Sequence, residues 1–535
     1  MSPYGTTSQK WLRAAQLTAI SAVGGLLVAM VAFLIWESTW VDHTTSPTPR
    51  DNFLYGTIGT EFMPLPVLQV LPDLFPDRFQ PAGPEGGDWV QQFGFIEGTP
   101  GVNDGLPLGL ATSHYRPQTG APSPMKFVGF SCALCHTSKI KRFEGDDGVI
   151  VTGMGSTSLD LFAWIDAVQG ALLDEERLSI DSVKRAYGAK FGKSLGLSEE
   201  LIIRLWLAEA RRQLKVAVTK YDEPRSGAEL RDANYMLNGP GRTQPFREIL
   251  RLVKDRPGAT DRAFTKFIAV YEQGNREWAQ VDGSVNDPVS RSVLASVAAG
   301  ATPENLLTPG IRNSLTTNVG YVAALKGPSY LEVFSELGIT IDQEKAERGR
   351  DVYMRNCASC HGYPDGDGRR WVKGERQGEV VPHEEIGTDA ERVTFRYYDV
   401  VADDIFDHFP DGHPLRPPRE SLRPGPLGTT RGYINAPLES VFTRAPYLHN
   451  ASVLTMAELL NLKPRRDVFY RGDSLYDPED MGLLSPNQPD GRHYYEFDTT
   501  KRGNSNKGHD YPWAYRGPGW DAEALEDLLE YLKAF

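Results

Sequence analysis

Every cysteine in the chain lies in one of two copies of the motif Cys-x-x-Cys-His. On one turn of helix the positions i, i+3 and i+4 share a face, so both thiols can reach one porphyrin while the imidazole faces its iron. A zinc site usually takes four Cys or His ligands at other spacings, and neither a redox-active thiol pair nor a disulfide requires the histidine. The sequence therefore predicts two covalently attached c-type haems and no disulfide. The motif residues are Cys132, Cys135, His136, Cys357, Cys360 and His361.

An uncharged apolar run near the N-terminus covers residues 14–36. At about 1.5 Å per residue it is long enough to cross a bilayer core of about 30 Å. Lys10 and Arg13 precede the run, and Glu37 and Asp42 follow it, which predicts a cytoplasmic N-terminus and a periplasmic remainder. A cleaved signal peptide is the alternative, but its apolar region is usually shorter and ends in an A-x-A site. We expect an uncleaved anchor in the inner (cytoplasmic) membrane, because c-type haem is attached outside the cytoplasm.

The length of the chain and the wide separation of the motifs predict two haem domains behind the anchor. About 500 residues follow the apolar run, which is too many for one small core. We expect a cytoplasmic tip and transmembrane anchor at 1–40, an N-terminal haem domain at 41–330 and a C-terminal cytochrome c-like haem domain at 331–535. The 52 glycines and 38 prolines predict long loops in a fold that is otherwise mainly α. A net charge of −13 argues against a nucleic-acid partner.

Two amphipathic patterns predict helices around the second motif. The segment "IDQEKAERGRDVYMRN" has apolar or small residues at helical spacing and runs directly into Cys357. The final segment "WDAEALEDLLEYLKAF" has a leucine stripe at helical spacing behind a potential N-cap, Asp521. Two such helices beside a Cys-x-x-Cys-His motif are typical of a cytochrome c core. The expected core positions are Ala346, Gly349, Val352, Tyr353, Leu525, Leu528, Leu529 and Leu532.

The two haem motifs, followed by "RAPYLHNASVLTMAELL", resemble the bacterial di-haem cytochrome c peroxidase superfamily. The wide motif spacing and the late segment "GNSNKGHDYP" are most similar to its rubber-oxygenase-like branch. The resemblance implies two cytochrome c-like domains in contact, in which one haem relays electrons and the other meets peroxide or oxygen. It also implies that His136 and His361 are the proximal ligands and that Tyr447 and His449 lie beside the C-terminal haem.

The N-terminal haem departs from the peroxidase pattern on its distal side. The peroxidases have a histidine soon after the first motif, whereas the next histidine after His136 is His361. Either this haem has an open sixth position, which we expect, or Met154 closes it, although a methionine in such a context often only fills a core. The superfamily also has a tryptophan between its haems. Three candidates are left unranked, namely Trp164, Trp206 and Trp278.

The sixth ligand of the C-terminal haem is predicted to be His509 rather than His449. Gly503 and Gly508 flank His509 and remove side chains that would keep the backbone from the porphyrin face. The resemblance points to the same loop, because the rubber-oxygenase-like branch has two histidines on this iron. His449, Met456 and Met481 are the alternatives.

Arg242, in "LNGPGRTQPF", is a further candidate for cofactor binding. Its guanidinium can pair with a haem propionate through two parallel hydrogen bonds. An ordinary solvated arginine is an equally good interpretation of the sequence.

Two functions from different classes fit these observations. As an enzyme, the chain would reduce peroxide, or activate oxygen against an organic substrate, at the N-terminal haem, with electrons relayed through the C-terminal haem. As an electron-transfer cytochrome, it would only link a membrane complex to a soluble carrier. The expected partners are the membrane and either a redox protein or a small-molecule oxidant. Iron coordination discriminates the two functions, because catalysis requires a vacant or displaceable sixth position whereas relay does not.

Overall fold

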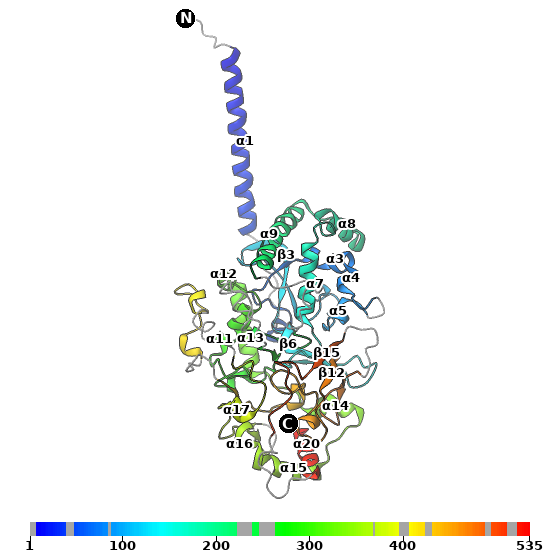
Figure 1. Cartoon of the computed structure of the whole chain (residues 1–535). Coiled ribbons are helices and arrows are strands. Elements are labelled where there is room, and N and C mark those ends of the chain that lie inside the picture. The colour runs from blue at the N-terminus through cyan, green and yellow to red at the C-terminus, as the bar shows by residue number, and fades with distance from the viewer. Residues whose placement is uncertain are drawn as a thin grey trace.

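The architecture was analysed in a computed structural model. It describes residues 7–38, 48–83, 87–221, 238–245, 263–366, 370–394, 406–422, 431–486, 494–510 and 522–535. A long helix, α1 (Thr7–Ser38), projects from a globular body. Figure 1 shows the N-terminal half of the body beside α1 and the C-terminal half at the opposite end.

Helix α1 has the properties of a membrane span. Its segment Trp11–Ala32 has a mean hydropathy of 1.9 and is fully exposed. It is the one helix in the described part of the chain that is long and apolar enough to cross a bilayer, and its length fits either an anchor or a signal sequence.

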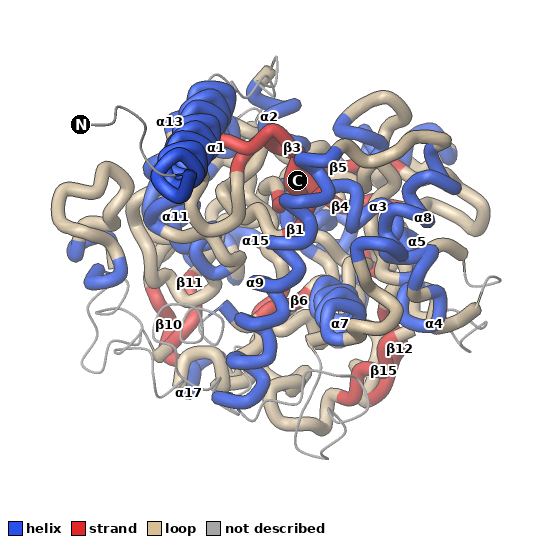
Figure 2. Tube along the Cα trace, turned by 90° about the horizontal axis from the view of Figure 1, so that it is seen from above, coloured by secondary structure: helices blue, strands red, loops and turns tan. Residues whose placement is uncertain are grey.

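The N-terminal half packs helices around a three-stranded antiparallel sheet with the order β1-β3-β2. Its largest hydrophobic core contains the sheet, α3, α7, α8 and α9, and encloses the fully buried Trp164. Figure 2 shows α9 lying across the face from which α1 projects. The helices of this half are α2 (Pro49–Tyr55), α3 (Leu65–Leu74), α4 (Pro76–Phe79), α5 (Trp89–Gln92), α6 (Ala133–His136), α7 (Leu161–Leu173), α8 (Ile180–Phe191), α9 (Leu197–Tyr221), α11 (Pro288–Ala298), α12 (Pro303–Leu307) and α13 (Pro309–Ala324). Its strands are β1 (Met63–Pro64), β2 (Leu110–Tyr115), β3 (Pro122–Phe130), β4 (Thr137–Ile140), β5 (Val149–Thr152), β6 (Arg242–Thr243) and β7 (Thr265–Lys266).

The C-terminal half has a second core, in which α15 (Gln343–Asn356) crosses α20 (Ala522–Leu532). The eight core positions expected from periodicity in these two helices are all buried. The predicted cap Asp521 lies outside the described residues. The other helices here are α14 (Tyr330–Phe334), α16 (Ala358–His361), α17 (His383–Ile386) and α19 (Met456–Leu459). The strands are β8 (Tyr363–Pro364), β9 (Trp371–Val372), β10 (Val380–Pro382), β11 (Gly432–Ile434), β12 (Val468–Arg471), β13 (Tyr476–Asp477), β14 (Gly482–Leu483) and β15 (Tyr495–Asp498).

The prediction of a mainly α fold is wrong. The described residues contain one three-stranded sheet and six two-stranded sheets in addition to the helices. Most of these strands are only two to four residues long and lie in segments that the glycine and proline content had marked as loops. The longest strand, β3, leads almost directly into the first haem motif. The second motif, in contrast, is preceded by helix α15.

The two cores exchange segments across the predicted boundary near residue 330. Ile140, Val151 and Met154 pack in the C-terminal core, whereas Phe409 and Leu415 pack in the N-terminal core. The domain boundary at residue 330 therefore stays a prediction. The two hydrophobic cores do not divide at this residue.

Close contact of α15 with α20 depends on Gly349. A Cβ atom at this position would lie 1.8 Å from the carbonyl oxygen of Asp527, so the helices would have to separate. We expect Gly349→Ala to destabilise the C-terminal half by about 1–3 kcal/mol or more, as overpacking does, and to lower Tm by roughly 5 °C or more. Thermal unfolding followed by circular dichroism checks this. Glu347→Ala, at an exposed position of α15, is the matched control, and equal melting of both variants would contradict the packing argument.

Candidate haem centres

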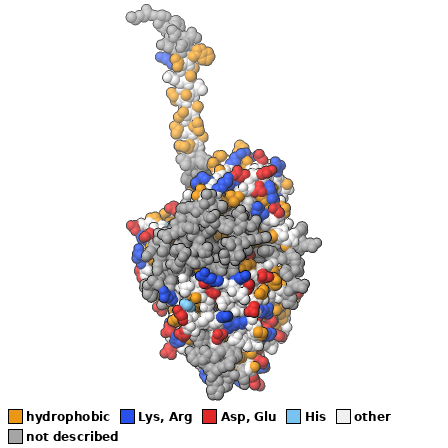
Figure 3. Space-filling model, in the orientation of Figure 1, with side chains coloured by type: hydrophobic (Ala, Val, Ile, Leu, Met, Phe, Trp, Pro, Cys, Tyr) orange, Lys and Arg blue, Asp and Glu red, His pale blue; other side chains and the backbone are white. Residues whose placement is uncertain are grey.

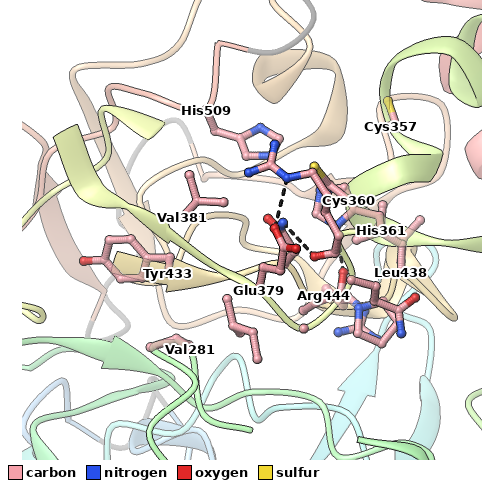
Figure 4. A pocket seen from close by; sticks show the side chains of 18 of the residues that line it. Val281, Cys357, Cys360, His361, Glu379, Val381, Tyr433, Leu438, Arg444 and His509 are labelled. Atoms are coloured by element: carbon pink, nitrogen blue, oxygen red, sulfur yellow. Dashed lines mark hydrogen bonds and ion pairs between the residues drawn. The ribbon is translucent and has the colours of Figure 1, made fainter. Parts of the chain in front are cut away.

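The C-terminal motif opens onto a cavity of about 960 Å³. The one-turn helix α16 carries the motif, and His361 N–H donates to the carbonyl of Cys357 at 2.9 Å. The Nδ1 atom of His361 lies 2.7 Å from the carbonyl oxygen of Ala436. Because a carbonyl can only accept, Nδ1 must carry the proton, which leaves Nε2 as the atom that can bind a metal. Figure 4 shows His361, Cys357 and Cys360 along one side of this cavity.

His509 lies in the same cavity, across from His361 (Figure 4). The two imidazole centroids are 6.1 Å apart, at an interplanar angle of 44°. A metal held between two imidazole nitrogens, each at about 2.0–2.1 Å, requires a separation of this size. Burial lowers the pKa of His509 to about 4, so the ring is neutral at physiological pH, as a ligand must be. The residues present therefore fit a haem with two axial histidines.

The loop that carries His509 is fixed by close backbone contacts. The N–H of His509 donates to the carbonyl of Ile386 at 2.7 Å. Gly508 has φ +82°, and a Cβ there would lie 2.2 Å from the carbonyl carbon of Gly387. The glycine therefore allows the loop to close against residues 386–388, which is a different reason from the contact with a porphyrin that the sequence had led us to expect.

Side chains that follow His449 hold this loop from the other side. Asn450 donates its amide protons to the carbonyls of Gly503 and Ser505, at 3.2 and 3.0 Å. The hydroxyl of Ser452 donates to the same Ser505 carbonyl at 2.9 Å. Arg465 donates to the carbonyls of Asn506 and Gly508. The "HNAS" segment thus positions the His509 loop. The sequence did not indicate this role, because the two segments are more than fifty residues apart.

Removal of these anchors should loosen His509 without deleting it. We expect Asn450→Ala, which removes the donor to the buried Gly503 carbonyl and one of the two donors to the Ser505 carbonyl, to cost about 1–3 kcal/mol of local stability. The C-terminal haem should then show a temperature-dependent mixture of six- and five-coordinate iron. Absorption spectra recorded between low and ambient temperature check this. Asn313→Ala, at an exposed position of α13, is the control, and a spectrum unchanged by Asn450→Ala would argue against the anchoring role.

His449 and Tyr447 lie in the wall of the same cavity. The hydroxyl of Tyr433 donates to the carbonyl of Asp389, so its oxygen accepts a hydrogen bond from the Nε2–H group of His449, at 3.0 Å. The two rings also stack, with centroids 4.2 Å apart. Tyr447 donates to the carbonyl of Met481 at 2.8 Å. The imidazole of His449 is therefore engaged with Tyr433 through Nε2 and by ring stacking.

The N-terminal motif opens onto a smaller cavity of about 370 Å³. The Nδ1 atom of His136 donates to the carbonyl of Ile268 at 2.8 Å, which again leaves Nε2 for a metal. Asn318 donates to Sγ of Cys132 at 3.3 Å. Burial raises the pKa of the Cys132 and Cys135 thiols to about 12. The arrangement fits one haem with His136 as its protein ligand.

The described lining of this cavity is largely apolar and contains one imidazole, that of His136. Met154 is not part of the lining, because it is completely buried in the C-terminal core. The largest apolar side chains around the cavity are those of Phe53, Phe130, Phe162 and Phe267.

A single segment forms the wall between the two cavities. Residues that line both are Lys266, Ile268, Gln273, Ala279 and Gln280. The backbone N–H of Lys266 donates to the carbonyl of His449 at 2.7 Å, and two residues later Ile268 accepts from His136. A short path of hydrogen bonds and backbone therefore joins the N-terminal proximal histidine to the C-terminal cavity.

The C-terminal cavity also contains cationic side chains. Arg276 and Arg444 both pair with Glu439, at 3.4 and 3.2 Å, and both line the cavity. Burial lowers the pKa of Arg276 to about 10. Two guanidinium groups with one carboxylate partner leave an excess of positive charge, which fits the anionic propionates of a haem.

Arg242 lies elsewhere. Its guanidinium is buried between the rings of Phe264 and Phe497, at 4.4 and 4.5 Å from their centroids. It donates to Oδ1 of Asn504 at 2.7 Å and lines neither cavity. This position does not support the predicted contact of Arg242 with a haem propionate.

The three tryptophans are distinguished by position. Trp278 lines the C-terminal cavity. Trp164 is buried in an aromatic cluster with Phe62, Trp89, Phe95 and Phe130, and Trp206 donates to the carbonyl of Phe62 at 3.1 Å. Trp278 is thus the candidate for a position near both centres.

Comparisons with known proteins agree with this chemistry. Residues 432–470 match a family described as RoxA-like, cytochrome c-like. This segment includes His449, Asn450 and Arg465 and supports a RoxA-like haem protein with a redox function. A cytochrome c-like domain implies covalently attached haem c, although a match in one half of the chain does not give the number of haems.

Two proteins of Sinorhizobium fredii (strain NBRC 101917 / NGR234) are similar to the chain. The uncharacterized protein y4iJ is 25% identical over 92% of this chain and 93% of its own length. The uncharacterized protein y4iM is 28% identical over 50% of this chain and 64% of its own length. The similarity to y4iJ therefore extends over both halves of the chain.

Proposed function

We propose that the chain is a di-haem c-type cytochrome oxidoreductase, held in the cytoplasmic membrane by α1 with the remainder in the periplasm. The N-terminal centre meets oxygen or peroxide, and the C-terminal centre relays electrons to it from a redox partner protein. When bound, the haems supply one-electron iron couples and, at the N-terminal site, an iron position for a small molecule.

The difference between the two cavities carries this proposal. The C-terminal cavity has two opposed imidazoles, those of His361 and His509, 6.1 Å apart. The described lining of the N-terminal cavity offers one imidazole, that of His136, among mostly apolar side chains and the cations Lys266, Arg291 and Arg392. Relay is favoured by six ligands that change little between oxidation states, and reaction with a small molecule is favoured by an available position.

The chain's own residues have distinct tasks in this scheme. The carbonyls of Ile268 and Ala436 fix the tautomer and orientation of the two proximal imidazoles. Apolar side chains such as Phe53 and Phe162 restrict water at the N-terminal centre, which strengthens electrostatic interactions inside it. The shared wall keeps the two cavities adjacent, so electrons need to cross only a short span of protein.

The purified full-length protein provides the test. Mass spectrometry of the denatured chain should give the polypeptide plus two haem masses. Paramagnetic-resonance and absorption spectra should contain one high-spin ferric signal, which responds to cyanide or peroxide, and one low-spin signal, which does not. Two low-spin signals that ignore small ligands in every oxidation state would favour the electron-transfer cytochrome instead.

A further inference from the structure

Helix α9 exposes an apolar stripe on the outside of the molecule. Its inner face is buried in the N-terminal core through Ile203, Leu207 and Leu214. On the outer face Leu197, Leu201 and Leu205 follow one another at every fourth position and are 88%, 55% and 63% exposed. Water-exposed leucines in such a row are uncommon on a soluble surface and mark a contact with an apolar phase.

The surface around this stripe is basic, unlike the rest of the chain. Residues 180–217, which include α8 and most of α9, contain eight Lys or Arg and four Asp or Glu, a net charge of +4 within a chain of −13. A groove of about 570 Å³ beside the stripe is lined by four cations, Arg204, Arg211, Arg212 and Lys215, and by one acid, Glu175, which pairs with Lys215 at 2.5 Å. Leucines flanked by cations are the pattern of a helix that lies in the interface of an anionic bilayer.

The position of α9 in the molecule agrees with this pattern. Helices α8 and α9 lie at the end of the body from which α1 projects, and both α1 and α9 approach strand β3 (Figures 1 and 2). Figure 3 shows Lys, Arg and hydrophobic side chains at this end, together with acidic ones. Residues 39–47 join α1 to the body, and nine residues at about 3.3–3.6 Å each limit the distance between them to at most about 32 Å.

We infer that the outer face of α9 is a second membrane contact, which seats Leu197, Leu201 and Leu205 at the headgroup boundary of the bilayer that α1 crosses. The ligand is a surface of anionic phospholipid. This contact fixes the orientation of the body, so that the C-terminal half and its cavity point away from the membrane toward a soluble redox partner. The inference rests on the proposed anchoring by α1.

The cysteine content of the chain allows a specific test. Because haem attachment consumes all four native cysteines, the thiol of a Leu201→Cys variant is the one site for a charged, membrane-impermeant maleimide. The full-length variant is labelled in detergent and in nanodiscs of phosphatidylethanolamine with phosphatidylglycerol. We expect labelling about tenfold slower in the discs, because the apolar face of an interfacial helix lies below the headgroups. Leu337→Cys, 39% exposed in the C-terminal half, is the matched control and should label equally in both.

Each outcome decides the inference. Protection that weakens in discs of phosphatidylcholine alone supports an anionic surface. Rapid labelling of Leu201→Cys in discs that contain the inserted chain overturns the membrane contact and leaves the anchor intact. Slow labelling already in detergent, together with a dimeric mass, would show that the leucine stripe contacts a second copy of the chain. This result also overturns the membrane contact. Failure of the chain to insert into discs overturns the anchoring and this inference together.

Discussion

Replacement of His509 by alanine should convert the C-terminal haem from six-coordinate low-spin to high-spin iron. His509 faces His361 with ring centroids 6.1 Å apart, and its loop is held on two sides by backbone and side-chain hydrogen bonds. Loss of the imidazole removes the side chain whose ring faces His361 at this distance. We expect nearly all of the low-spin ferric signal of this haem to disappear. The measurement is paramagnetic resonance of the full-length variant, and addition of imidazole should restore the low-spin signal.

The His449→Ala variant tests whether His449 is an iron ligand or only a residue of the cavity wall. Nε2 of His449 is bound to the Tyr433 hydroxyl, so its removal should shift the absorption spectrum slightly and leave the spin state unchanged. The assignment of His509 fails if the low-spin signal survives in His509→Ala and vanishes in His449→Ala. A Met456→Ala variant tests the remaining candidate that lines the cavity, because thioether ligation would give a higher potential.

Local patterns predicted the parts of the molecule that local chemistry determines. The helical spacing around Gly349 and Leu528 gave the correct buried faces of α15 and α20, because an amphipathic period survives in any tertiary context. Each Cys-x-x-Cys-His motif ends in a one-turn helix, as its spacing requires.

Features that depend on distant partners were not predictable in this way. Strands β6 and β7 have two residues each and exist only because they pair with one another across residues 244–264. The function of Asn450 depends on a loop more than fifty residues later in the chain. The expectation for Gly508 was correct about a close approach, but the approaching group is the backbone of Gly387, which a sequence without contacts cannot identify.

Lys266, in the wall shared by the two cavities, also could not be predicted from the sequence. Lys266 has no motif around it, yet its side chain lines both cavities. Its ammonium donates to the carbonyls of Arg444 and Pro446, the latter at 2.6 Å, and burial lowers its pKa to about 7. A buried cation next to two redox centres favours the reduced form of each, because reduction adds a negative charge nearby.

Lys266→Met should therefore lower the midpoint potentials of both haems. One unit charge at roughly 10 Å and an effective dielectric constant near 20 is worth about 1.7 kcal/mol, or about 70 mV for one electron. Lys266→Arg retains the positive charge, so both midpoint potentials should stay close to those of the wild type. A spectroelectrochemical titration, in which the high-spin and low-spin haems are followed at separate wavelengths, measures the two potentials in one experiment.

Arg276→Met is the matched control, because Arg276 lines the C-terminal cavity alone. It should lower the C-terminal potential by clearly more than the N-terminal potential, because the Coulomb term falls as distance grows. A Lys266→Met variant that changes one potential only would place the charge on one side of the wall. The pH dependence distinguishes charge from packing: since the folded-state pKa of Lys266 is depressed, its positive charge is present below about pH 7 and is lost above it. The difference in potential between wild type and Lys266→Met should therefore be largest in acid and shrink as the pH rises through 7, whereas a difference caused by altered packing would not follow this titration.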